Sequence, residues 1–171
     1  LETGTDLAVL KTGDESVYRY DQMGTHSYEN SSMQTGTNST SYYFSVASGD
    51  ITNFFNEVDL NTPWDYHYEN LDSRTILDRL AAVKYFVVKA GEEEYLPYGY
   101  DTLAAEAEKK DRLYRAYECK NALPIGYTYD SYIPEKKYAK MSTVEKQQAL
   151  LQGVVLADSA VPETTPEFND R

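Results

Sequence analysis

The sequence predicts an α+β fold, with a mixed, mainly antiparallel sheet of about four to five strands and three or four packed helices. Three observations support this prediction. Short strand-like segments are interleaved with separate helical segments, without the regular alternation of a doubly wound parallel sheet. A helical pattern at 73–83 runs almost directly into the apolar run at 85–88, which is typical of a strand covered on both faces. A well-marked helix follows at 142–152.

The first part of the chain predicts two strands and a helix. Residues 17–21 (VYRYD) and 42–46 (YYFSV) are rich in β-branched and aromatic residues, as strands are. Residues 24–40 between them are dense in Ser, Thr, Asn and Gly, which favours a loop. A helix is predicted over 48–58, because Ser48 can cap it and apolar residues recur at helical spacing. Those residues are Ile51, Phe54, Phe55 and Val58.

The second part predicts further strands around the apolar run at 85–88. After a loop at 91–99, we expect a short helix at 102–110. Residues 113–119 (LYRAYEC) and 125–133 (IGYTYDSYI) have the composition or alternation of strands. The expected sheet therefore combines the strands near residues 17, 85, 115 and 128.

The helix at 142–152 has signals at both ends. Ser142 and Glu145 have the spacing of a capping box, and Gly153 stands where a C′ glycine belongs. Residues 154–156 then predict an edge strand.

A length of 171 residues fits one domain. We expect a flexible N-terminal segment at 1–15, a single domain at 16–159 and a C-terminal linker at 160–171. The net charge of −12 makes nucleic acid an improbable partner, since phosphate neutralisation needs clustered Lys and Arg. The sequence has no apolar run near 18 residues, so we expect no direct insertion of this segment into lipid. The single cysteine, Cys119, is expected to be a buried, inert thiol.

Aromatic residues in two predicted loops are candidates for glycan contact. Exposed aromatic rings can stack on sugar C–H groups, while neighbouring acids accept bonds from hydroxyls. The candidate residues are Trp64, Tyr66, Tyr98 and Tyr100. The alternative is that these rings attach their loops to the core.

Acidic residues at 59–72 allow two further interpretations. The first is a hard-cation site, but Trp64 stands where a calcium loop needs glycine, so a solvated loop is favoured. The second is an independent hydrolase using acids such as Asp65, Glu69 and Asp72. We expect no metal and no cofactor, and we assign no catalytic residue.

Several segments, in order along about half the chain, resemble the YfhO family of bacterial polytopic membrane proteins. They are Val17–Asp21, Asn30–Met33, Tyr43–Val46, Leu71–Val88, Tyr95–Tyr100, Asn121–Ser131 and Met141–Leu156. The family is similar to C-type glycosyltransferases, which use polyprenyl-phosphate sugars at the outer face of the membrane. The resemblance implies that this chain is an extracytoplasmic accessory domain of such a protein in the cell membrane of a Gram-positive bacterium.

The same resemblance implies a function and partners. The parent protein would glycosylate lipoteichoic acid or another cell-wall polymer, and this domain would contact its transmembrane part and cell-wall glycan. The catalytic acid expected in the family lies between membrane helices, so no catalytic residue is transferred to this chain. A non-enzymatic surface module that binds glycan or a partner protein is the alternative.

Overall fold

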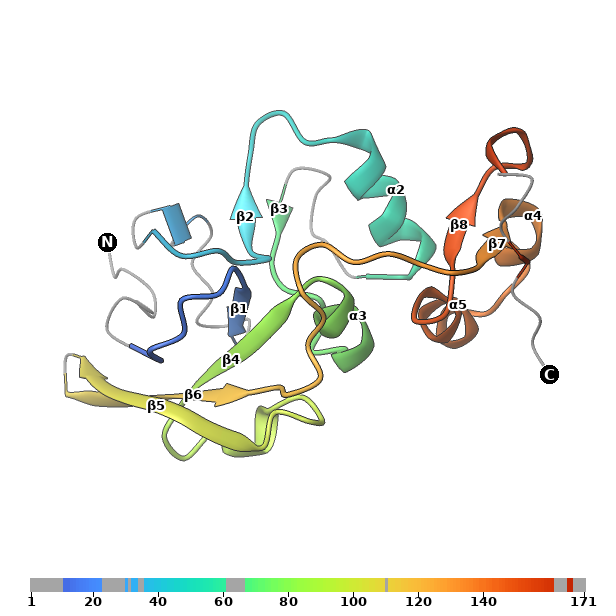
Figure 1. Ribbon diagram of the computed structural model, residues 1–171. Helices are drawn as coiled ribbons and strands as arrows, with labels where there is room; N and C mark the ends of the chain where they lie inside the picture. The colour runs from blue at the N-terminus through green and yellow to red at the C-terminus, as the bar shows by residue number, and fades with distance from the viewer. Residues whose placement is uncertain are drawn as a thin grey trace.

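The centre of the fold is a four-stranded sheet with the strand order β1-β4-β6-β5 (Figure 1). The computed structural model describes residues 11–22, 30, 32–33, 36–60, 67–109, 111–161 and 166–167. β1 is parallel to β4, whereas β6 is antiparallel to both β4 and β5. The strands are β1 (Arg19–Gln22), β4 (Val83–Lys89), β5 (Thr102–Lys109) and β6 (Arg112–Glu118). This sheet and the helices described below confirm the α+β prediction.

Strand β4 is buried on both faces, as its apolar sequence predicts. On one face, Phe86 and Val88 join a core cluster that includes Leu77 of the preceding helix. On the other face, Tyr85 and Val87 form a second cluster with residues of the neighbouring strands. A strand with apolar side chains on both faces is stable only when both faces are covered.

Helix α3 (Thr75–Leu80) leads into β4 through two residues, which confirms the predicted helix-to-strand junction. The helix is shorter than predicted at both ends. Asp72 and Ser73 both have a φ of 54°, a left-handed conformation that an α-helix excludes. Ala82, with a φ of 59°, redirects the chain at the other end.

The prediction of a helix at 102–110 is wrong, because these residues form β5. Ala and Glu favour helices in isolation, but pairing along β6 outweighs that preference here. Glu106 lies opposite Arg115, whose guanidinium bonds the carboxylates of Glu106 at 2.8 Å and Glu93 at 2.6 Å. The hairpin of β5 and β6 therefore gains a cross-strand ion pair that only tertiary structure assembles.

The predicted strand at 125–133 is wrong for most of its length. Its last two residues begin β7 (Tyr132–Pro134), which pairs in parallel with the predicted edge strand, β8 (Val154–Leu156). The preceding residues run between the helices without joining a sheet (Figure 1). The Tyr127 hydroxyl donates to the Leu80 carbonyl at 3.3 Å, and the Tyr129 hydroxyl donates to the Leu150 carbonyl. These bonds to helix ends replace the expected strand pairing.

The remaining elements lie outside the central sheet (Figure 1). Helix α2 (Gly49–Glu57) lies close to its predicted bounds, but the side chain of its N-cap residue, Ser48, makes no capping hydrogen bond. Helix α5 (Thr143–Leu150) has the predicted capping box. A short helix, α4 (Glu135–Tyr138), was not predicted. Strand β2 (Tyr42–Tyr43) pairs in antiparallel orientation with β3 (His67–Tyr68). The chain also has two short 3₁₀ helices, η2 (Glu93–Tyr95) and η3 (Asp158–Ala160).

The expected boundary between residues 15 and 16 stays a prediction, but contacts to the sheet begin before it. The Asp14 carboxylate forms an ion pair with Lys84 and accepts a 3.0 Å hydrogen bond from the Tyr85 hydroxyl. The Lys84 ammonium, followed by the Ser16 hydroxyl, lowers the pKa of Asp14. Asp14 thereby connects the start of the described chain to β4.

Gly153 is required for close packing, not for a left-handed helix cap. Its φ lies outside the left-handed region. A Cβ atom added there would lie 3.1 Å from Ile133 Cγ1 and 3.2 Å from the Ser131 carbonyl oxygen. The glycine therefore lets the start of β8 approach β7.

The Gly153→Ala variant is expected to lower the free energy of unfolding by about 1–3 kcal/mol, because the added methyl group overpacks the β7–β8 contact. Urea unfolding would measure this. Gly126→Ala is the matched control, because a Cβ at that position has no atom within 4 Å. Equal stability of the two variants would contradict this role for Gly153.

Candidate functional site

The two described aromatic candidates, Tyr98 and Tyr100, do not share one exposed surface. Tyr98 is 91% exposed, whereas Tyr100 is buried at 2% exposure. The Tyr100 hydroxyl donates to the Val83 carbonyl at 2.8 Å, and its ring packs edge-on against Phe86. The ring of Tyr100 therefore attaches its loop to the core and is closed to a glycan. Trp64 and Tyr66 lie outside the described residues.

The acidic residues of the 59–72 segment do not converge where they are described. The Asp59 carboxylate accepts a bond from the Thr143 hydroxyl, and Asp72 pairs with Arg74 at 3.2 Å. Asp65 and Asn61 lie outside the described residues. Within the described part of the chain, no group of three or more His, Cys, Asp or Glu side chains has the arrangement of a metal site. Cys119 is buried, as predicted.

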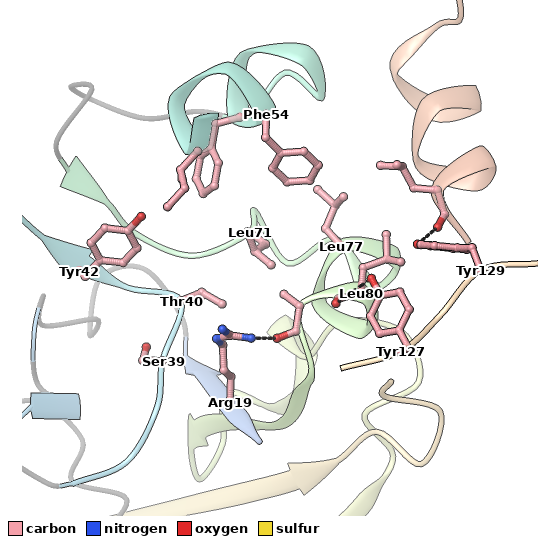
Figure 2. Close-up of a pocket in the computed structure, with 14 residues that line it drawn as sticks. Arg19, Ser39, Thr40, Tyr42, Phe54, Leu71, Leu77, Leu80, Tyr127 and Tyr129 are labelled. Carbon is pink, nitrogen blue, oxygen red and sulfur yellow. Dashed lines mark hydrogen bonds between the residues drawn. The ribbon is translucent and has the colours of Figure 1, made fainter. Parts of the chain in front are cut away.

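A cavity of about 350 Å³ is the candidate site (Figure 2). It lies among α2, α3, the end of α5 and two connecting segments, at 39–42 and 127–129. Its volume is within the range of small-molecule and cofactor sites. The described lining residues are Arg19, Ser39, Thr40, Tyr42, Ile51, Phe54, Phe55, Leu71, Leu77, Leu80, Ala81, Tyr127, Tyr129 and Leu150.

The walls of the cavity are mostly apolar because two helices turn their core-facing sides toward it. Helix α2 contributes Phe54 and Phe55, and helix α3 contributes Leu77 and Leu80. Figure 2 shows these side chains with Tyr42 on one side of the cavity and Tyr127 and Tyr129 on another. The sequence predicted the apolar faces of both helices, but not that a gap remains between them.

Five of the six described lining side chains that carry a polar atom already bond to the protein. The Arg19 guanidinium donates to the Ala81 carbonyl at 2.7 Å, and Tyr127 and Tyr129 donate to the helix-end carbonyls. Ser39 Oγ accepts from the Ser41 amide, and the Thr40 hydroxyl donates to Asp21. These five side chains use their polar atoms to hold the walls in place. A bound molecule would therefore meet mainly apolar side chains.

A pair of buried carboxyl groups lies next to the cavity walls. Asp21 of β1 and Asp78 of α3 are both fully buried. Asp21 accepts from the Thr40 hydroxyl and from the Gln22 amide at 2.9 Å. Neither carboxyl oxygen of Asp78 has a hydrogen-bond partner among the described residues. Sequence reasoning missed both, although an aspartate on the buried face of each element was a usable signal.

Burial dominates the protonation of this pair. Desolvation raises the pKa of Asp21 from 3.8 to about 7, although bonds from Thr40 and Gln22 oppose the change. Desolvation also raises the pKa of Asp78 well above its ordinary value, and the charge of Asp21 adds to this effect. A buried carboxyl without a partner is held in its neutral form because the low dielectric penalises its charge.

The fold and the cavity define the class of the molecule as an α+β domain with an apolar pocket. Within its described part, no helix has the length and apolarity needed to cross a bilayer. The chain belongs to the family described as "Bacterial membrane protein YfhO", which it matches over residues 4–170. This match confirms the resemblance found in the sequence.

A relative in Bacillus subtilis (strain 168), the protein YfhO, is 28% identical to the chain over 161 residues. The alignment includes 92% of this chain but 18% of the relative, so the chain spans less than a fifth of that protein's length. No solved structure matches the chain.

The free energy of unfolding of this chain is expected to fall as the pH rises from about 5 to about 8. The folded chain retains protons on Asp21 and Asp78 that the unfolded chain has already released, so folding takes up protons in this range. For Asp21, the difference between 3.8 and about 7 corresponds to roughly 4 kcal/mol at most. Denaturant unfolding at a series of pH values would measure the slope.

Asp78→Asn is expected to weaken the dependence of the free energy of unfolding on pH. It should also stabilise the chain at about pH 8, because the amide carries no charge to desolvate. Asp111→Asn is the control, since it removes one negative charge from an exposed hairpin position. A wild-type profile without slope between about pH 5 and pH 8 would contradict the buried-pair interpretation.

Proposed function

We propose that this chain is the extracytoplasmic accessory domain of a polytopic, glycosyltransferase-like membrane protein, and that it supports glycosylation of lipoteichoic acid or another cell-wall polymer. The observation that carries the proposal is the match over residues 4–170 to a family of bacterial membrane proteins, with a relative much longer than this chain. On this proposal, the chemistry lies in the remainder of the protein, and the domain holds or shapes what the remainder acts on.

The geometry of the cavity supports an accessory role. Its lining is largely apolar, and Arg19, Tyr127 and Tyr129 are committed to main-chain carbonyls. Proton transfer needs a titratable group within hydrogen-bond reach of the reacting atom. Asp21 accepts a hydrogen bond from the lining residue Thr40, but its carboxyl group is fully buried. The cavity is therefore better suited to holding an apolar surface than to catalysing a reaction.

A non-enzymatic surface module that binds glycan or a partner protein is the second candidate. It is favoured by Tyr98, whose ring is 91% exposed, and by the half-exposed Tyr95 in the same segment. The carboxylates of Glu92 and Glu94 belong to this segment and supply acceptors for sugar hydroxyls. On this proposal, the glycan contact involves Trp64, Tyr66 and Tyr98, without Tyr100.

Replacing residues 16–159 of the complete protein by a short Gly/Ser linker is expected to abolish or strongly reduce wall-polymer glycosylation. The physical reason is that the membrane part loses the surface that positions its acceptor. Glycosylated polymer would be quantified from purified cell walls, with the amount of membrane-inserted protein measured in parallel. Unchanged glycosylation at equal protein level would contradict the accessory role.

If the surface-module proposal is correct, Tyr98→Ala should weaken binding to wall fragments about ten-fold, as expected for the loss of one aromatic anchor worth about 1.4 kcal/mol. Calorimetric titration with purified fragments would measure the dissociation constant. Trp64→Ala is the companion variant, and Leu113→Ala, on the β5–β6 hairpin, is the control. The absence of binding by the unmodified chain, with no effect of either aromatic substitution, would rule out this proposal.

A further inference from the structure

Exposed apolar side chains occur on two segments of the chain, 44–51 and 125–127, that also contribute residues to the lining of the cavity. We call this set the apolar rim: Phe44, Val46, Ile51, Ile125 and Tyr127. Val46 is 89% exposed, and the other four are between 38% and 49% exposed. Contiguous apolar surface of this kind marks interaction sites on folded proteins.

The apolar rim is continuous with the cavity. Ile51 and Tyr127 belong to the rim and also line the cavity. The Phe44 ring packs against the ring of Tyr42, another lining residue, with centroids 5.1 Å apart. Val46 and Ile125 are two residues away from Phe44 and Tyr127 along the chain. Ile51, Tyr127 and Phe44 therefore extend the apolar lining of the cavity to the protein surface, and Val46 and Ile125 are close to them in sequence.

We propose that the apolar rim and its cavity form the docking surface for an apolar segment from the membrane-embedded remainder of the same protein. This inference rests on the proposed function, because it requires that remainder to exist. The aligned region makes up 18% of the relative, so most of that protein lies outside the region and could supply the occupant. Covering a large apolar side chain contributes about 1.5–3 kcal/mol, so a few rim residues suffice to hold the domain in place.

Size and charge argue against the other occupants. Val46 and Ile125 do not belong to the cavity lining, so a single hydrocarbon chain inside the cavity would leave them exposed, whereas a larger protein segment could cover them as well. The net charge of −12 opposes docking on an anionic bilayer. It also opposes pairing of two copies, each carrying the same charge. Neither the size objection nor the charge objection applies to a segment of the protein's own membrane part.

The test is site-specific photo-crosslinking in the complete protein in native membranes. A photoreactive amino acid replaces Ile51, and in a matched control it replaces Leu113, which is aliphatic, equally exposed at 38% and placed on the β5–β6 hairpin. The expected product at Ile51 is an intramolecular crosslink to a peptide from outside this domain, absent at Leu113. Mass spectrometry after proteolysis identifies the linked peptide.

Each other outcome overturns the inference: a lipid adduct at Ile51, a crosslinked dimer, no product, or equal yields at both positions. A second pair of variants distinguishes the loss of docking from misfolding of the domain. With the photoreactive residue at Val46, Ile51→Glu should abolish the crosslink, because docking would bury a charge, whereas Leu113→Glu should leave it unchanged. Urea unfolding of each variant shows whether the domain remains folded. A crosslink at Val46 that survives Ile51→Glu in a folded domain also overturns the inference.

This readout is independent of activity. If no crosslink forms while deletion of residues 16–159 still reduces glycosylation, the docking surface is wrong and the accessory role stands. If the crosslink forms while deletion leaves glycosylation unchanged, the docking surface stands and the accessory role is wrong.

Discussion

The structure depends on covering both faces of β4. This strand carries an almost unbroken apolar sequence, and each of its faces contributes to a separate core cluster. β1 and β6 flank it in opposite orientations, so the sheet must be mixed. Helix α3 reaches β4 through two residues and therefore packs on the sheet beside it. Asp14 reaches Lys84 and Tyr85 from the N-terminal side, so even the start of the described chain contacts this strand.

The cavity is a consequence of the same arrangement. Helix α3 is held close to β4, while α2 belongs to a segment that enters the core from the side of β2 and β3 (Figure 1). The segment at 127–129 crosses near the space between them, and its tyrosines bond to the carbonyls of Leu80 and Leu150. Those carbonyls lie at helix ends and lack helical partners, so the tyrosines satisfy groups that would otherwise need water. The walls are thereby held apart, and an apolar space remains open at one side.

The composition of the site restricts its chemistry. A tyrosine-rich sequence suggested ring surfaces for glycan, yet Tyr100, Tyr127 and Tyr129 use their hydroxyls to bond main-chain carbonyls. The two buried carboxyls, Asp21 and Asp78, are the groups with the most unusual protonation, but they lie inside the protein. What remains accessible around the cavity is mainly apolar.

The sequence by itself determined the elements with local signals: the capping box at Ser142, the apolar strand at 83–89, the helix at 49–57 and the family. Tertiary structure alone decided the rest. Residues 102–109 have helical composition but become a strand, since pairing with β6 and the Glu106–Arg115 contact exceed their local preference. Residues 125–131 alternate like a strand but lie between helices, because their tyrosines find acceptors there. The cavity and the burial of both Asp21 and Asp78 arise from side chains that are distant in sequence, and no local pattern shows which of them come together.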